Sequence, residues 1–189
     1  MAAIQQQNRV FANAERGTLE LESSEFEQCT FTSCDFSGMS VFDAVFRDCT
    51  FVNCNFAMVK FGDAVLRDVV FTGCKLTGSD FSGERDFTSF TFTDCLLDYA
   101  IFQQLKIKRT RFLRCSLTEA DFSGADLTSA DFAECALDGA LFDQTNLSGA
   151  DFRTARGYAL DPERNRLRKA QFSLYGVSGL LQKYGILVE

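Results

Sequence analysis

Eight cysteines are the residues of this chain best suited to chemistry, because a thiolate can attack an electrophile, bind a metal or form a disulfide. Six of them recur every 20 residues, with one gap of 21, at Cys34, Cys54, Cys74, Cys95, Cys115 and Cys135. Cys29 and Cys49 repeat the same 20-residue spacing. The chain has no histidine and no C-x-x-C pair, so we expect no zinc or other metal site.

Catalytic motifs are also missing from the sequence. Without histidine the usual general base near neutral pH is lacking. The sequence contains no phosphate-binding G-x-x-x-x-G-K-[ST], no G-x-S-x-G and no dinucleotide fingerprint. Carboxylates are abundant and recur regularly along the chain. Some pair of them will therefore lie at a catalytic distance by chance, so such a pair does not indicate an active site. We therefore expect neither enzymatic activity nor a cofactor.

A five-residue period positions the cysteines and organises the whole chain. From Leu117 to Phe152 every fifth residue is Leu or Phe, and the residue two places earlier is nearly always Ala or Cys. This period matches neither a strand nor a helix. It predicts a solenoid in which each unit of five forms one side of a square coil and four units complete a turn. All eight cysteines then fall at the small inward position, where we expect reduced thiols that fill the core.

The period predicts one elongated domain with three parts. Residues 1–20 are polar and off-pattern, and we interpret them as a cap over the open end of the solenoid. The repeat occupies residues 21–172, with one inserted residue near 82–86, where the centre after Phe81 is Phe87. Arg85, Phe90 and Leu105 stand where small inward residues are expected, which predicts a bulge or a change of direction between residues 82 and 107.

Residues 173–189 form the third part, which has helical rather than five-residue spacing. Ser173 is the predicted N-cap, and Gly185 is the predicted end of the helix. Two roles remain open for this apolar tail: a lid on the last coil, or a dimer contact across a twofold axis. The residues expected in the dimer contact are Leu174, Val177, Leu180, Leu181, Tyr184, Ile186 and Val188.

The units Ala120–Gly124 (ADFSG) and Ala125–Ser129 (ADLTS) carry an A/C-D-L/F-x-x pattern. With these units the chain resembles the pentapeptide repeat family, whose fold is an all-β solenoid, the right-handed quadrilateral β-helix. Its length, its layout and its tail are similar to the Qnr-like and microcin B17 immunity protein-like members. That resemblance implies a homodimer that imitates a DNA duplex, binds DNA gyrase or topoisomerase IV and blunts topoisomerase poisons, as in quinolone resistance. In one departure, Qnr proteins carry two projecting loops, whereas here a single residue near Glu84 interrupts the repeat.

The charge pattern offers two candidate surfaces. Residues 17–105 carry a net charge of −9, residues 106–115 carry +5, and residues 116–155 carry −7. The acids of the last segment are the predicted partner-binding surface: Glu119, Asp121, Asp126, Asp131, Glu134, Asp138, Asp143 and Asp151. The alternative is that aspartate before each centre supports turn hydrogen bonds and solubility. We expect the basic belt of residues 106–114 to pair with acids on adjacent coils and not to bind nucleic acid directly.

Two questions stay open at this point. The protein either binds a topoisomerase, as the resemblance implies, or is a non-enzymatic interaction scaffold for an unrelated partner. No apolar run reaches the ~18 residues of a membrane span, and the first residues do not resemble a signal peptide, so we expect a cytoplasmic protein with no membrane contact.

Overall fold

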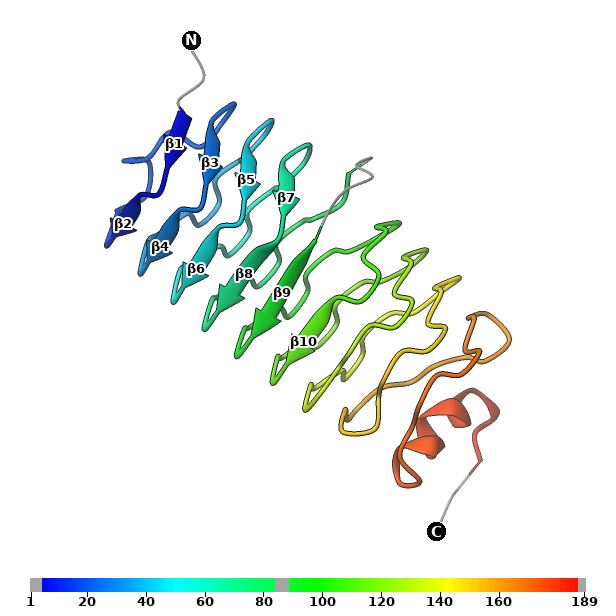
Figure 1. Ribbon diagram of the computed structural model, residues 1–189. Helices are drawn as coiled ribbons and strands as arrows, with labels where there is room; N and C mark the ends of the chain where they lie inside the picture. The colour runs from blue at the N-terminus through cyan, green and yellow to red at the C-terminus, as the bar shows by residue number, and fades with distance from the viewer. Residues whose placement is uncertain (1–4, 84–88, 187–189) are drawn as a thin grey trace.

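The computed structural model describes residues 5–83 and 89–186, which form a parallel β-solenoid (Figure 1). Its strands are β1 (Gln5–Gln7), β2 (Val10–Ala12), β3 (Glu25–Glu27), β4 (Thr30–Thr32), β5 (Val45–Arg47), β6 (Thr50–Val52), β7 (Val65–Arg67), β8 (Val69–Thr72), β9 (Phe90–Thr93) and β10 (Arg111–Leu113). Two short 3-10 helices, η1 (Gly176–Leu180) and η2 (Gln182–Tyr184), follow at the C-terminal end. None of the helices in the described ranges is long and apolar enough to cross a membrane.

Four walls surround the core of the right-handed solenoid. Wall 1 contains the sheet β1-β3-β5-β7 and continues along the bridged column from Lys106 to Arg166. Wall 2 contains the sheet β2-β4-β6-β8-β9-β10. Walls 3 and 4 follow the bridged columns from Asp35 to Arg156 and from Ser40 to Leu141. Because every coil adds 20 residues, residues 20 apart lie on the same wall, one strand spacing of about 4.8 Å from each other.

Stacked phenylalanine rings fill the interior. On wall 2 the rings of neighbouring coils have centroids 4.7–5.4 Å apart and lie within 16° of parallel. This column contains Phe11, Phe31, Phe51, Phe71, Phe92, Phe112, Phe132, Phe152 and Phe172. A second column on the opposing wall 4 contains Phe61, Phe81, Phe102, Phe122 and Phe142. The predicted alternation of Phe with Leu or Ile on successive walls is confirmed in the second half of the rod.

The cysteines are confirmed as buried, free thiols of the core. Most of their sulfurs donate to backbone carbonyls of the preceding coil, as Cys54 does to Phe31 at 3.4 Å. Burial raises the pKa of the Cys49 thiol to about 11, because the surrounding core cannot solvate a thiolate. The Cys49 thiol therefore stays protonated in the folded protein, and burial keeps all eight thiols away from reagents in solution.

The first coil begins earlier than the sequence pattern indicates. β1 pairs with β3 in parallel register, and the Phe11 ring stacks on Phe31 at 4.8 Å. Gln6 and Phe11 thus occupy centre positions within the segment expected to be a cap. The phase was hidden because Gln6 is polar where the other centres are apolar.

The inserted residue shifts the pairing without ending the solenoid. Val69 pairs with Phe90, an offset of 21 instead of 20 residues. Phe90 and Leu105 both point inward and are buried, and they border a small cavity of roughly 10 Å³. Walls 2 to 4 continue past this point in parallel register, so the solenoid keeps its direction there. Arg85 and Phe87 lie outside the described residues.

The tail folds back on the last coil as a lid. Its two 3-10 helices replace the α-helix that the apolar spacing predicted. Gly179 packs so closely on Tyr158 that an added Cβ would lie 2.3 Å from its carbonyl oxygen, and the Gly179 carbonyl accepts a hydrogen bond from Leu160. Gly185 ends η2 with a φ of 62°, as predicted. The predicted N-cap was wrong by two residues: Tyr175 precedes η1, and Ser173 Oγ instead accepts a hydrogen bond from the Gly176 N–H within the turn before this helix.

Candidate interaction surface

Each unit of five exposes the residue before its centre and the two residues after it. On this basis the eight predicted acids lie on all four walls and do not form one patch. Wall 1 carries Asp126, wall 2 carries Asp131, Glu134 and Asp151, wall 3 carries Glu119 and Asp138, and wall 4 carries Asp121 and Asp143. Neighbours in the sequence therefore face in different directions around the rod.

Turn support accounts for the aspartates that precede a centre. Asp121 Oδ1 accepts a hydrogen bond from the backbone N–H of Ser123 at 2.9 Å, and Asp126 and Asp131 repeat this contact at 3.1 Å. Burial disfavours the charge of Asp121, but the hydrogen bonds from Ser123 outweigh it and hold the pKa of this carboxyl below its ordinary value. The turn hydrogen bonds that the alternative predicted are therefore present, and they fix these carboxylates in place.

Salt bridges neutralise much of the charge on this half of the rod. Lys108 pairs with Asp126 at 3.3 Å, Arg111 with Asp131 at 3.7 Å, and Arg114 with Asp94 at 2.6 Å. These three pairs confirm that the basic belt contacts acids of adjacent coils. Two further pairs, Arg153 with Asp151 and Arg164 with Asp143, neutralise two more of the predicted acids.

The most acidic surface is wall 4, which a linear reading of the sequence misses. From residue 20 to residue 144 its outward positions carry one base, Lys60, and seven acids, a net charge of −6. The acids are Glu20, Glu22, Asp43, Asp63, Asp80, Asp121 and Asp143. Writing the sequence in rows of 20 residues would have revealed this column.

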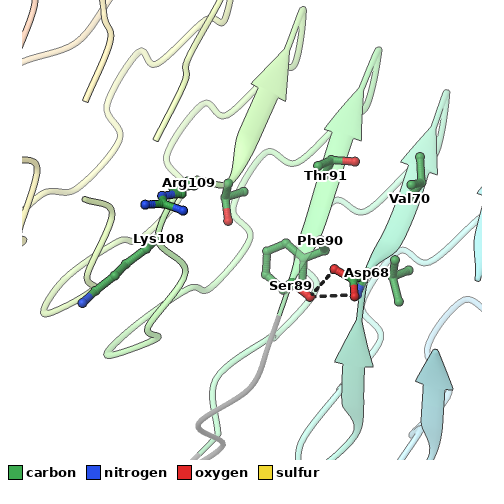
Figure 2. A pocket seen from close by; sticks show the side chains of 9 residues that line it. Asp68, Val70, Ser89, Phe90, Thr91, Lys108 and Arg109 are labelled. Carbon is green, nitrogen blue, oxygen red and sulfur yellow. Dashed lines mark hydrogen bonds between the residues drawn. The ribbon is translucent and has the colours of Figure 1, made fainter. Parts of the chain in front are cut away.

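A groove of about 340 Å³ opens beside the insertion, between β8 and the basic belt (Figure 2). Val70, Phe90 and Arg109 are among the residues that line it. Two of its polar residues bond to each other: the Ser89 hydroxyl accepts from the Asp68 N–H at 2.8 Å and donates to the Asp68 carboxylate at 3.0 Å. Within residues 5–83 and 89–186 no three potential metal ligands gather in one place.

The tail presents an exposed apolar surface at the C-terminal end. Of the residues predicted for a dimer contact, Leu174, Val177, Tyr184 and Ile186 are exposed, Leu174 to 86%. Tyr175 is 93% exposed and was not predicted. Leu180 and Leu181 are half-buried, and Leu180 packs against the core. Val188 lies outside the described residues.

This geometry defines the class of protein as a parallel β-solenoid with five-residue sides. Two family models match the sequence, pentapeptide repeat region over residues 24–102 and pentapeptide repeats (9 copies) over residues 107–155. The chain belongs to the pentapeptide repeat family, whose members are generally structural or interaction proteins rather than enzymes. None of the curated proteins matches the sequence.

Solved pentapeptide repeat structures are similar over nearly the whole chain. A trypsin-treated form of QnrB1, a plasmid-mediated fluoroquinolone resistance protein, is 19% identical with a TM-score of 0.64, covering 98% of this chain and 100% of that one. A second trypsin-treated form is 20% identical with a TM-score of 0.55, covering 99% of each chain. HetL, involved in heterocyst differentiation regulation in the cyanobacterium Nostoc sp. strain PCC 7120, is 19% identical with a TM-score of 0.59, covering 90% of this chain and 87% of that one. At these identities the likeness shows the fold alone.

Proposed function

We propose that this protein is a non-enzymatic DNA mimic that binds DNA gyrase or topoisomerase IV through wall 4 and so modulates topoisomerase poisons. The acidic column of wall 4 is the observation that carries the proposal. Its net charge of −6 extends over six coil steps, or about 29 Å, which is one charge per ~4.8 Å. One strand of a duplex carries a charge every ~3.4 Å, so wall 4 approaches the linear charge density of one strand.

The carboxylates of wall 4 are well placed to meet a cationic DNA-binding surface. Asp80 and Asp121 are held by hydrogen bonds from Ser82 and Ser123 at 2.9 Å, so little side-chain freedom is lost on binding. A column of like charge also accelerates the approach of a cationic partner.

Dimerisation through the tail would lengthen this charged wall. Leu174, Val177, Tyr184 and Ile186 expose apolar surface at the end of the rod, which favours a twofold contact between two tails. Val177→Asp should give a monomer in light scattering. Leu180 is unsuitable for this test because its substitution also disturbs the lid. An unchanged mass for Val177→Asp would remove the tail from this role.

The experiment for wall 4 measures binding to gyrase and DNA supercoiling, each with and without a fluoroquinolone. The variant combines Glu22→Gln, Asp80→Asn and Asp121→Asn. Asparagine keeps the turn hydrogen bond, as Asn55 does to the Ala57 N–H at 3.1 Å. At about 0.5 kcal/mol for each lost charge, affinity should fall about tenfold.

The matched control removes three charges from the other walls, through Asp35→Asn, Asp126→Asn and Asp131→Asn. Its affinity for gyrase should fall much less than that of the wall 4 variant. Equal losses in both variants would mean that net charge rather than wall 4 matters. A wild-type protein that neither binds gyrase nor changes supercoiling would refute the proposal.

Wall 2 favours a second candidate, an interaction scaffold for an unrelated protein. Its outward positions before and after each centre are uncharged from Val10 to Thr93 and are mainly Thr and Val. Val10 is 72% exposed and Val70 is 37% exposed. Affinity capture that recovers a partner other than topoisomerase subunits, and loses it with Thr50→Lys, would support the scaffold.

A further inference from the structure

Two basic segments with the same pattern lie on wall 1. Each segment has a base before its centre, a base directly after it, and a base at the second position after it, where the chain turns the corner to the next wall. The segments are Lys106-Ile107-Lys108-Arg109 and Arg166-Leu167-Arg168-Lys169. They are 60 residues apart, which is three coils in the 20-residue phase. A linear reading separates them, since it assigns one to a basic belt and the other to the tail region. We propose, contrary to the expectation for the basic belt alone, that the two segments together form a single site for the phosphate backbone of duplex DNA.

The backbone places the two basic segments in register. Lys106, Asp126, Asn146 and Arg166 follow one another as parallel bridges, so the two segments share one column. Ile107 is buried and Leu167 packs against the core, which directs the flanking bases outward. Arg109 and Lys169 occupy equivalent corners, with φ values of 60° and 61°.

The surface between the two segments is small, polar and nearly free of acid. Thr128, Ser129, Asn146 and Ser148 lie there. Thr128, Asn146 and Ser148 are tied to one another and to Asp126 by hydrogen bonds, so they form a small, fixed polar surface over which a phosphate backbone can pass. Asp126 is the one acid at the outward positions from 106 to 169 on this wall, and Lys108 pairs with it at 3.3 Å. With six bases against one acid, this half of wall 1 has a net charge of +5, in a protein whose overall charge is −7.

The bases at both ends of this surface are available to a ligand. Arg109, Arg166, Arg168 and Lys169 are exposed, and across the described ranges none of them forms a salt bridge. Three coil spacings separate the two segments by about 14 Å. That span covers about four phosphates of one DNA strand at ~3.4 Å each.

The composition of this surface favours a nucleic acid over an acidic protein. Protein interfaces depend on buried aromatic or large apolar anchors. The large exposed apolar residues of the described chain lie on the other three walls and in the tail, and none is on wall 1. Cations with small hydroxyl and amide groups suit sequence-independent contact with sugar and phosphate. The site is distinct from acidic wall 4, so one rod can present an imitation of DNA and a contact to DNA on adjacent walls.

The test measures binding of a labelled DNA duplex by fluorescence anisotropy over a range of salt concentrations. With contacts from the four available bases, log K against log salt should have a slope of about −3.6. Arg166→Gln, Arg168→Gln and Lys169→Gln together should reduce the magnitude of this slope to about a quarter and weaken binding at low salt more than tenfold. Glutamine suits the corner position, because Gln28, Gln104 and Gln144 already have a positive φ there.

The matched control carries Lys60→Gln, Lys75→Gln and Arg156→Gln, which remove three charges from walls 3 and 4. It should keep the wild-type slope. Failure of the wild-type protein to bind the duplex at low salt would overturn the proposal, as would an equal loss in the control. Salt-sensitive self-association without DNA that is lost in the wall 1 variant would also overturn it, because wall 1 would then contact an acidic wall of a second copy. Gyrase is absent from this assay, so its outcome is independent of the proposed function.

Discussion

Replacing Phe112 by alanine removes a ring from the middle of the wall 2 column. The side chain is fully buried, with ring centroids 5.4 Å from Phe92 and 5.1 Å from Phe132 on the coils before and after it. Phe102 and Phe122 contact it edge-on, both at 5.9 Å. A buried Phe→Ala change costs about 3–5 kcal/mol, and the value grows when the site cannot collapse.

Collapse is restricted here because the backbone ladder fixes the coil spacing. The N–H of Phe112 donates to the Asp131 carbonyl at 2.7 Å, and similar bonds hold the coils on either side. We therefore expect a loss near the upper end of the range, about 4–5 kcal/mol of unfolding free energy. Phe112→Leu should cost only about 1–1.5 kcal/mol, because Ile107 and Leu117 show that a branched aliphatic centre fits the neighbouring walls.

Phe11→Ala is the matched control at the end of the column. Its ring is partly exposed, with one stacked neighbour, Phe31, and one edge-on neighbour, Phe26, where Phe112 has two of each. Its loss should therefore be less than half that of Phe112→Ala. Urea denaturation followed by circular dichroism measures all three variants, and an unchanged m-value would show that the rod still unfolds as one unit. A cost below about 2 kcal/mol for Phe112→Ala, or equal costs at both sites, would refute the idea of a rigid, tightly packed column.

Three further predictions concern the thiols and the tail. Cys49, whose pKa burial raises to about 11, should resist a thiol reagent in the folded protein and react once denaturant unfolds the chain; reaction without denaturant would contradict its burial. Gly179→Ala should detach the lid, because the new methyl would overlap the carbonyl of Tyr158, and protease should then cut the tail faster; Ser178→Ala, on the exposed side of η1, should leave cleavage unchanged. The Lys183 ammonium holds the pKa of Asp161 below its ordinary value. The contact therefore stabilises the folded protein fully at any pH above the ordinary pKa of aspartate, and this stabilisation is lost as the pH falls through the lowered pKa of Asp161. Lys183→Met should accordingly lower the unfolding temperature at neutral pH and have no effect below the lowered pKa.

The core could be predicted from the sequence because its rule is local. A small residue and a large apolar residue two positions later recur every five residues, and this pattern alone fixes which side chains point inward. The rule failed where a centre is polar. Gln6 occupies a centre position although it is not apolar, so the first coil could not be recognised from the pattern. It also failed in the tail, where the contact of Gly179 with Tyr158 accompanies 3-10 turns and involves residues distant in sequence.

The surface was harder to predict because neighbours in sequence are not neighbours in space. Asp121, Asp126 and Asp131 follow one another at intervals of five residues, so each lies on a different wall. Charges that act together are instead 20 residues apart, as Asp43 and Asp63 are on wall 4. Salt bridges such as that between Lys108 and Asp126 depend on the same phase, so charge counts over linear windows overestimated the exposed field.

Asp121 separates the two roles that aspartate plays in this fold. Asp121→Asn keeps a side-chain oxygen for the Ser123 N–H and removes the charge, as Asn146 does with the Ser148 N–H at 3.3 Å. Its unfolding free energy should change by less than about 0.5 kcal/mol, whereas Asp121→Ala leaves that N–H without its partner and should cost about 1 kcal/mol.

Urea denaturation of both variants, combined with binding to the partner, distinguishes the two contributions. If the charge matters only for recognition, Asp121→Asn and Asp121→Ala should weaken binding equally while they differ in stability. If Asp121→Asn destabilises the fold as much as Asp121→Ala, the negative charge itself supports the turn. The acidity of wall 4 would then be a consequence of folding and would no longer be evidence for a binding surface.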